Sequence, residues 1–215
     1  KTAIVTGGNS GLGQAFAMAL AKAGANIFIP SFVKDNGETK EMIEKQGVEV
    51  DFMQVGITAE GAPQKIIAAC CERFGTVDIL VNNAGGGGPK PFDMPMADFR
   101  RAYELNVFSF FHLSQLVAPE MEKNGGGVIL TITSMAAENK NINMTSYASS
   151  KAAASHLVRN MAFDLGEKNI RVNGIAPGAI LTDALKSVIT PEIEQKMLQH
   201  TPIRRLGQPQ DIANA

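Results

Sequence analysis

The sequence predicts an α/β protein with a doubly wound parallel sheet whose two faces are covered by helices, giving three αβα layers. Two observations predict this class. Short runs rich in β-branched residues alternate with longer helical patterns along the chain, and a glycine-rich loop separates the first run from the first helix. The 215 residues contain no linker, charge run or low-complexity stretch, so we expect a single domain.

The first half of the chain alternates regularly between the two kinds of pattern. Short apolar runs bounded by glycine, asparagine or serine predict strands, and apolar residues three or four apart predict helices. The expected strands are residues 2–6, 26–31, 48–55 and 77–83, and the expected helices are residues 11–24, 38–47 and 63–75. Units of strand, helix and strand with these lengths form right-handed crossovers between parallel strands.

The second half continues the same alternation. The expected helices are residues 98–122 and about 147–165, and the expected strands are residues 127–133 and 170–176, which brings the sheet to six strands. Ligands of doubly wound sheets bind beyond the carboxyl ends of the strands. Apolar residues at helical spacing between residues 182 and 200 indicate a mobile lid. Asp211 marks the start of a further helix.

Composition excludes several classes of function. Lysine and arginine number 20 against 21 acids, so a formal charge of -1 gives no general attraction to nucleic acid or to an anionic membrane. Cys70 and Cys71 are adjacent and the three histidines are scattered, so no metal site is expected. No apolar run approaches the roughly 20 residues of a spanning helix, and the chain opens directly on a strand. We therefore expect a cytoplasmic protein with a small-molecule substrate.

The loop TGGNSGLG, residues 6–13, joins the first strand to the first helix. Its glycines let the backbone turn tightly and approach a pyrophosphate, and the amides at the start of the helix favour an anion. A loop in this setting predicts a Rossmann-type dinucleotide site. The second strand ends at Ser31, where an NAD-binding chain usually presents a carboxylate, and Lys34 follows. We expect NAD as the cofactor and leave NADP open.

Tyr147 and Lys151 stand four residues apart in a helical pattern, so they share one face of the helix. An ammonium beside a phenol favours the phenolate, which suits a group that gives and takes protons. The same spacing is also typical of an ordinary surface contact on a helix. Spacing alone leaves both interpretations open.

Several motifs follow one another in a fixed order along the chain. They are TGxxxGxG from Thr6, NNAG from Asn82, a serine after the fifth strand at Ser134, YxxxK from Tyr147, and PG from Pro177. With these motifs the chain resembles the short-chain dehydrogenase/reductase family over nearly its whole length. The resemblance implies hydride transfer between a nicotinamide cofactor and a secondary alcohol or ketone. It also implies a homo-oligomer, because relatives form tetramers through the two long helices of the second half.

The resemblance implies a role for individual residues. Tyr147 would exchange a proton with the substrate oxygen, Ser134 would hydrogen-bond that oxygen, and Lys151 would hold the nicotinamide ribose. Asn106 would complete the active tetrad by anchoring a water. The implied cofactor-binding residues are Gly7, Asn9, Ser10, Gly11, Leu12, Gly13, Ser31, Gly56, Ile57, Asn83, Ala84, Gly85, Tyr147, Lys151, Pro177, Gly178, Ile180, Leu181 and Thr182. The implied substrate-binding residues are Gly87, Ser134, Asn139 and Tyr147.

The two halves of the chain resemble different members of the family. Residues from about 77 onward resemble members that act on 7α-hydroxysteroids such as bile acids, whereas residues 1–75 resemble an oxidoreductase similar to sugar-acid dehydrogenases. This difference predicts a chimera joined near VDILVNNAG, although a natural homologue with a diverged cofactor half also fits. Residues 1–85 would form the dinucleotide-binding half and residues 86–215 the catalytic half. Ser31 and Gly56 replace aspartates of the steroid-oxidising relatives, which should weaken adenosine binding.

Three functions remain open at this point. The leading one is NAD(P)-dependent oxidation of a 7α-hydroxysteroid. The alternatives are a dehydrogenase of sugar acids of the deoxy-gluconate type, and a folded chain that binds dinucleotide without turnover. The last alternative gains weight from the end of the chain at Ala215, since relatives continue with a seventh strand that we expect to be missing.

Overall fold

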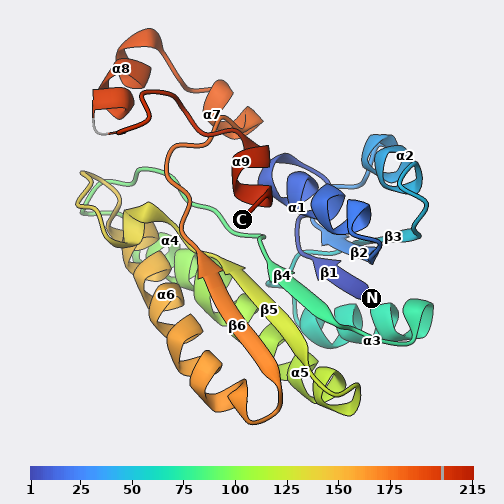
Figure 1. Ribbon diagram of the computed structural model, residues 1–215. Helices are drawn as coiled ribbons and strands as arrows, with labels where there is room; N and C mark the ends of the chain where they lie inside the picture. Colours follow the sequence, from blue (N-terminus) through green and yellow to red (C-terminus); the bar gives the residue numbers. More distant parts are fainter. Residues whose placement is uncertain (200) are drawn as a thin grey trace.

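Six parallel strands form one sheet in the order β3-β2-β1-β4-β5-β6 within residues 1–199 and 201–215, which are the residues that the computed structural model describes (Figure 1). The strands are β1 (Thr2–Val5), β2 (Asn26–Ser31), β3 (Val50–Gln54), β4 (Ile79–Asn82), β5 (Gly127–Ile132) and β6 (Ile170–Ile175). The strand order reverses between β1 and β4. The predicted single-domain, doubly wound sheet is therefore confirmed, while one end of the expected lid, residue 200, lies outside the described residues.

Helices cover both faces of this sheet, as Figure 1 shows. The longer ones are α1 (Gly11–Lys22), α2 (Glu38–Glu44), α3 (Ala62–Phe74), α4 (Met96–Tyr103), α5 (Ser109–Lys123) and α6 (Thr145–Gly166). The shorter pieces are η2 (Met135–Ala137), α7 (Asp183–Lys186), α8 (Pro191–Gln199) and α9 (Pro209–Ala213). None of the helices in the described part of the chain is long and apolar enough to cross a membrane.

Two apolar clusters, one on each face, hold the layers together. Along β1, Ile4 packs with the side chains of α3, α5 and α6, whereas its neighbours Ala3 and Val5 pack with α1 and α2. Successive side chains of a strand point to opposite faces, so a sheet covered on both sides needs apolar residues at every position. This requirement explains the mostly apolar runs of the inner strands, whereas the edge strands β3 and β6 include polar residues, among them the exposed Arg171 and Asn173 of β6.

The helix predicted over residues 98–122 is interrupted in the structure. A π-helical turn, η1 (Glu104–Phe108), separates α4 from α5. The turn contains Asn106, whose side chain is buried and hydrogen-bonds to the backbone of Gly86. Such turns occur mostly as local bulges in helices, often at functional sites. The other expected elements are present, with ends that differ by a few residues.

The segment between β6 and α9 is closed by a bridge between two of its own residues. Ile180 and Gly207 form an isolated parallel bridge. The N–H of Leu181 donates to the Gly207 carbonyl at 2.7 Å, and the N–H of Gly207 donates to the Ala179 carbonyl at 3.0 Å. A Cβ at position 207 would collide with Ile180 Cδ1, so any larger residue there requires the end of the Ile180 side chain to move. Figure 1 shows α7 and α8 projecting from this base.

Candidate active site

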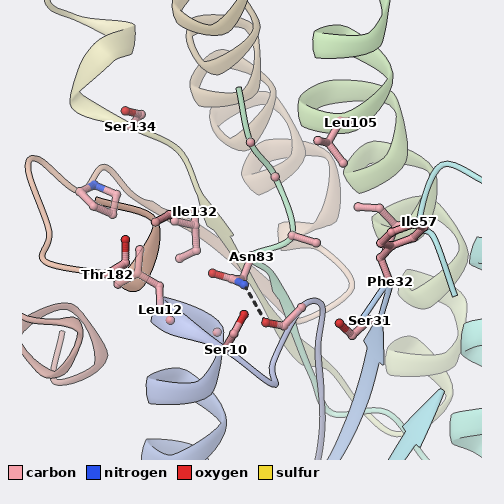
Figure 2. A pocket seen from close by; sticks show the side chains of 18 of the residues that line it. Ser10, Leu12, Ser31, Phe32, Ile57, Asn83, Leu105, Ile132, Ser134 and Thr182 are labelled. Atoms are coloured by element: carbon pink, nitrogen blue, oxygen red, sulfur yellow. Dashed lines mark hydrogen bonds between the residues drawn. The ribbon is translucent and has the colours of Figure 1, made fainter. Parts of the chain in front are cut away.

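A cavity of about 860 Å³ opens at the carboxyl ends of the strands. Every one of the six strands contributes the loop that follows it, which places the cavity where strand order reverses. In Figure 2, Ser31, Phe32 and Ile57 lie at one end of the cavity and Ser134 and Thr182 at the other, with Asn83 between them. The cavity is thus long enough to bring the loops of both halves of the sheet to one ligand.

Most of the site residues expected from the sequence line this cavity. They are Gly7, Ser10, Gly11, Leu12, Gly13, Ser31, Gly56, Ile57, Asn83, Ala84, Gly85, Ser134, Tyr147, Lys151, Pro177, Gly178, Ile180 and Thr182. Others lie outside its lining, namely Asn9, Gly87, Asn106, Asn139 and Leu181. Of these, Leu181 faces a separate groove beside α1, and Asn139 follows η2 in an exposed loop.

Further lining residues were not expected from the sequence. They are Pro30, Phe32, Val55, Thr58, Gly86, Arg101, Leu105, Ile132, Thr133 and Ala184. Most of them flank an expected residue at the end of a strand, so the rule that ligands bind beyond the carboxyl ends of strands could have found them. Arg101 and Leu105 come instead from α4 and η1, which pass beside the cavity. No strand-end rule points to them.

The glycine loop forms a cradle for an anion. Gly7 has a φ of +63° and donates its N–H to the Pro30 carbonyl at 2.8 Å, which ties the loop to the end of β2. A side chain at Gly13 would collide with the carbonyl oxygen of Gly7. No side chain caps the start of α1, and its first turn holds no acid. The amide groups there remain directed toward an external anion, which the helix dipole favours.

Asn83 fixes the loop after β4 against the end of β1. Its amide nitrogen Nδ2 donates to the Thr6 carbonyl at 2.8 Å. The Thr6 hydroxyl accepts from the backbone N–H groups of Asn83 at 3.0 Å and of Ala84 at 2.9 Å. The Asn83 side chain therefore acts first as a clamp within the protein, although it also lines the cavity.

The end of β2 presents neutral polar groups to the cavity. The Ser31 hydroxyl is almost fully buried and donates to Asn9 Oδ1 at 2.7 Å, and Asn9 Nδ2 donates to the Val33 carbonyl at 2.8 Å. Among the described lining residues, the charged ones are Arg101 and Lys151, and both are cations. A lining with two cations and no carboxylate complements a polyanion such as a dinucleotide pyrophosphate.

Tyr147, Lys151 and Ser134 meet at the opposite end. Lys151 Nζ lies 5.9 Å from the centre of the Tyr147 ring and donates to the Ile132 carbonyl at 2.8 Å. Only 6% of Lys151 is exposed, and this burial lowers its pKa to about 8. Ser134 Oγ accepts from the Ala136 N–H at 3.1 Å, which leaves the hydroxyl proton of Ser134 available to a ligand. The arrangement can stabilise a phenolate and bind a substrate oxygen.

Asn106 lies behind this cluster and joins three segments. Its Oδ1 accepts from the Gly86 N–H at 3.0 Å, and its Nδ2 donates to the Gly86 carbonyl at 2.8 Å and to Ser150 Oγ at 3.1 Å. The Ser150 hydroxyl, which has no solvent exposure, in turn donates to the Tyr147 carbonyl at 2.7 Å. The network links η1, the loop after β4 and α6. A role of Asn106 in anchoring a water stays a prediction.

The described residues contain no group of three or more histidine, cysteine, aspartate or glutamate side chains placed to hold a metal ion.

Comparison with known proteins gives consistent matches along the chain. The model of the short chain dehydrogenase family matches residues 1–192. The 7alpha-hydroxysteroid dehydrogenase of Escherichia coli (strain K12) is 73% identical over 216 residues, covering 100% of this chain and 85% of that protein. The uncharacterized oxidoreductase YgcW of the same strain is 58% identical over 217 residues, covering 100% of this chain and 83% of that protein.

A solved structure provides a comparison with bound ligands. It is a 7 alpha-hydroxysteroid dehydrogenase complexed with NADH and 7-oxo glycochenodeoxycholic acid, with a TM-score of 0.93 and 72% identity, covering 100% of this chain and 84% of that chain. The matches to the hydroxysteroid dehydrogenase and to YgcW each extend over the whole chain. They do not support the chimera joined near residue 77 that the sequence suggested.

Proposed function

Because the chain belongs to the short-chain dehydrogenase family, we propose that it oxidises the 7α-hydroxyl group of bile acids to the ketone with NAD, and catalyses the reverse reaction. The observation that carries the proposal is a single cavity with the glycine cradle at the start of α1 and the cluster of Ser134, Tyr147 and Lys151. A single ligand in this cavity would have its phosphates at the glycine cradle and its reacting end at the cluster of Ser134, Tyr147 and Lys151.

The cavity fits a nicotinamide dinucleotide. The space left by the missing side chain of Gly13 and the uncapped amides of α1 would hold the pyrophosphate. Ser31, Gly56 and Ile57 would surround the adenosine end. The nicotinamide end would contact Lys151 and the loop after β6, through the lining residues Pro177, Gly178, Ile180 and Thr182. Such a cofactor supplies the acceptor or donor of hydride.

The chain's own residues would move and hold the proton. The Tyr147 oxygen would take the proton of the substrate hydroxyl during oxidation and return it during reduction. The free hydroxyl proton of Ser134 would bind the same oxygen and stabilise charge on it. The Lys151 ammonium would favour the Tyr147 phenolate. Asn106, through its hydrogen bonds to Gly86 and Ser150, would hold the loop after β4 and helix α6 in fixed positions relative to each other.

The substrate class rests on the relatives. A protein 73% identical over the whole chain is named a 7alpha-hydroxysteroid dehydrogenase, and a structure 72% identical contains a 7-oxo bile acid. Gly87 and Asn139 would lie on the substrate side, and residues 86–215 would form the catalytic half, with residues 1–85 holding the cofactor.

The experiment is to mix the protein with NAD and a 7α-hydroxy bile acid and to follow NADH formation. The wild-type protein should form NADH with the 7α-hydroxy compound and not with its 7β epimer. A Tyr147→Phe variant should form no NADH with either compound. Oxidation of a deoxy-gluconate without steroid turnover would instead assign the chain to sugar acids. Binding of NADH, seen by nicotinamide fluorescence, without any turnover would identify a dinucleotide-binding protein that is not an active enzyme.

A homo-oligomer, a tetramer as in relatives, forms part of the proposal. Exposed aromatic side chains on η1, α5 and α6 support it, because Phe163 is 91% exposed and Phe108 and Phe111 are also open to solvent. Native mass spectrometry tests the assembly. The free thiols of Cys70 and Cys71 support a cytoplasmic location, where thiols stay reduced, and cell fractionation tests it.

A further inference from the structure

Gly87 lies directly against the ring of Tyr147. A Cβ atom at position 87 would lie 2.7 Å from Tyr147 Cδ2, 3.2 Å from its Cβ and 3.3 Å from its Cγ. The backbone of Gly87 also has a φ of +149°, a region that L side chains rarely adopt. The adjacent Gly88 has no atom within 4 Å of a Cβ placed there. Within this run of glycines, the close approach to Tyr147 is therefore specific to Gly87.

The segment that carries Gly87 is itself held in place. Gly86 exchanges two hydrogen bonds with the Asn106 side chain, at 3.0 and 2.8 Å. A Cβ at Gly85 would lie 2.9 Å from Asn106 Oδ1 and 3.1 Å from Lys151 Nζ. Residues 85–87 thus form a glycine strap between the π-helical turn and α6. A Cβ on Gly85 would crowd Lys151 and a Cβ on Gly87 would collide with Tyr147, so the strap can pass this close to both because it has no side chains.

We propose that Gly87 is a positioning residue for Tyr147. As part of the strap, Gly87 fixes the phenol ring of Tyr147, so that the phenol hydroxyl stays directed into the cavity. This inference rests on the proposed function, in which the Tyr147 hydroxyl transfers the substrate proton. Tyr147 lines the cavity and Gly87 does not. Gly87 therefore acts through the ring, in addition to any contact of the loop with substrate.

The geometry sets the size of the effect. Ordinary van der Waals contact begins at 3.4 Å, so a Cβ placed at 2.7 Å forces the Tyr147 ring or the strap to move by several tenths of an ångström. A misplacement of about 1 Å in an active site can cost about 100-fold in rate. We expect Gly87→Ala to lower kcat by about 10- to 100-fold and to change NADH affinity much less, because the pyrophosphate cradle lies at the start of α1.

The test compares Gly87→Ala with the matched variant Gly88→Ala. The chain has 2 tyrosines, Tyr103 and Tyr147, so isotope-labelled tyrosine gives two nuclear magnetic resonance signals that Tyr147→Phe assigns. In Gly87→Ala the Tyr147 signal should shift and kcat should fall, while the Tyr103 signal stays constant and the Kd of NADH changes much less than kcat. Gly88→Ala should change none of them. An unshifted Tyr147 signal in Gly87→Ala, or equal effects of both variants, would overturn the inference.

A stability measurement keeps the inference testable where Gly87→Ala folds poorly. The variant is also made in a Tyr147→Ala background, in which no ring opposes the added Cβ. Gly87→Ala should lower Tm less in this background than in the wild type. An equal loss in both backgrounds would assign the need for glycine to its φ alone and would overturn the inference. If the wild-type protein is inactive on bile acids, the proposed function is wrong. The tyrosine signals would still test whether the strap positions the Tyr147 ring.

Discussion

Replacing Lys151 with methionine should stabilise the cofactor-free protein near neutral pH while abolishing turnover. Lys151 is 6% exposed and has no acidic partner among the causes of its shifted pKa, which burial lowers from 10.5 to about 8. At about 1.4 kcal/mol per pKa unit, the buried ammonium costs the fold about 3 kcal/mol at pH 7. Methionine has a similar length and no charge, so it removes this cost.

The pH dependence identifies the cause. Below pH 8 both the folded and the unfolded chain hold the Lys151 proton, and the full cost applies. Between pH 8 and 10.5 the unfolded chain holds the proton and the folded chain loses it, so the free energy of unfolding rises with pH. The advantage of Lys151→Met should therefore be largest near pH 7 and shrink through this window.

Chemical denaturation at a series of pH values measures the effect. Cys70, whose pKa burial raises to about 12, lowers stability as the pH rises above 9, but it is present in both proteins and cancels in their difference. A gain of about 3 kcal/mol corresponds to a Tm about 6–12 °C higher for a chain of this size. The exposed Lys65→Met serves as a control and should change little. A stability difference that is independent of pH, or a variant less stable than wild type at pH 7, would refute the reasoning.

Three further substitutions test other parts of the site. Gly13→Ala, which places a methyl group against a carbonyl of the glycine loop, should weaken NADH binding at least about 10-fold by fluorescence titration; unchanged affinity would contradict the cradle. Ser31→Asp should favour NAD over NADP by about 10-fold in the ratio of their Kd values, because a carboxylate accepts from a ribose hydroxyl and repels a phosphate. Ser150→Ala should cost about 1–3 kcal/mol of stability in denaturation and lower kcat, since it leaves a buried amide donor short of a partner. Ser149→Ala, one residue away and outside that network, should cost less, and equal losses would argue against the network.

The sequence was most informative where one physical requirement determines both the residue pattern of a segment and the position of that segment in the fold. β2 has the predicted bounds, residues 26–31, because its buried apolar centre, Ile27 to Ile29, is bounded by the polar residues Asn26 and Ser31. The loop of residues 6–13 was predicted from its glycines and its position between a strand and a helix. The spacing of Tyr147 and Lys151 predicted a shared helix face, and the family resemblance implied the common site; both residues line the cavity.

Other features leave no trace in hydrophobic periodicity. The π-helical turn around Asn106 displaces the helix by a single residue, which the apolar pattern of residues 98–122 does not reveal. Arg101 lines the cavity from a helix rather than from a strand end. The contact of Gly87 with Tyr147 joins residues far apart in the chain, so a run of glycines could only suggest a close approach without naming the group approached.

The bridge between Ile180 and Gly207 bears on how this protein could be redesigned. The segment between these two residues leaves and rejoins the domain at adjacent points, so the ends of any replacement are already held together. Lengthening a loop whose ends are fixed costs little, about 0.6 kcal/mol for each doubling of its length. The segment can therefore be exchanged as a cassette for one of another length, changing what covers the cavity while the sheet and Tyr147 stay in place. Keeping both Ile180 and Gly207 avoids any repacking of the Ile180 side chain, whose Cδ1 would collide with a Cβ at position 207.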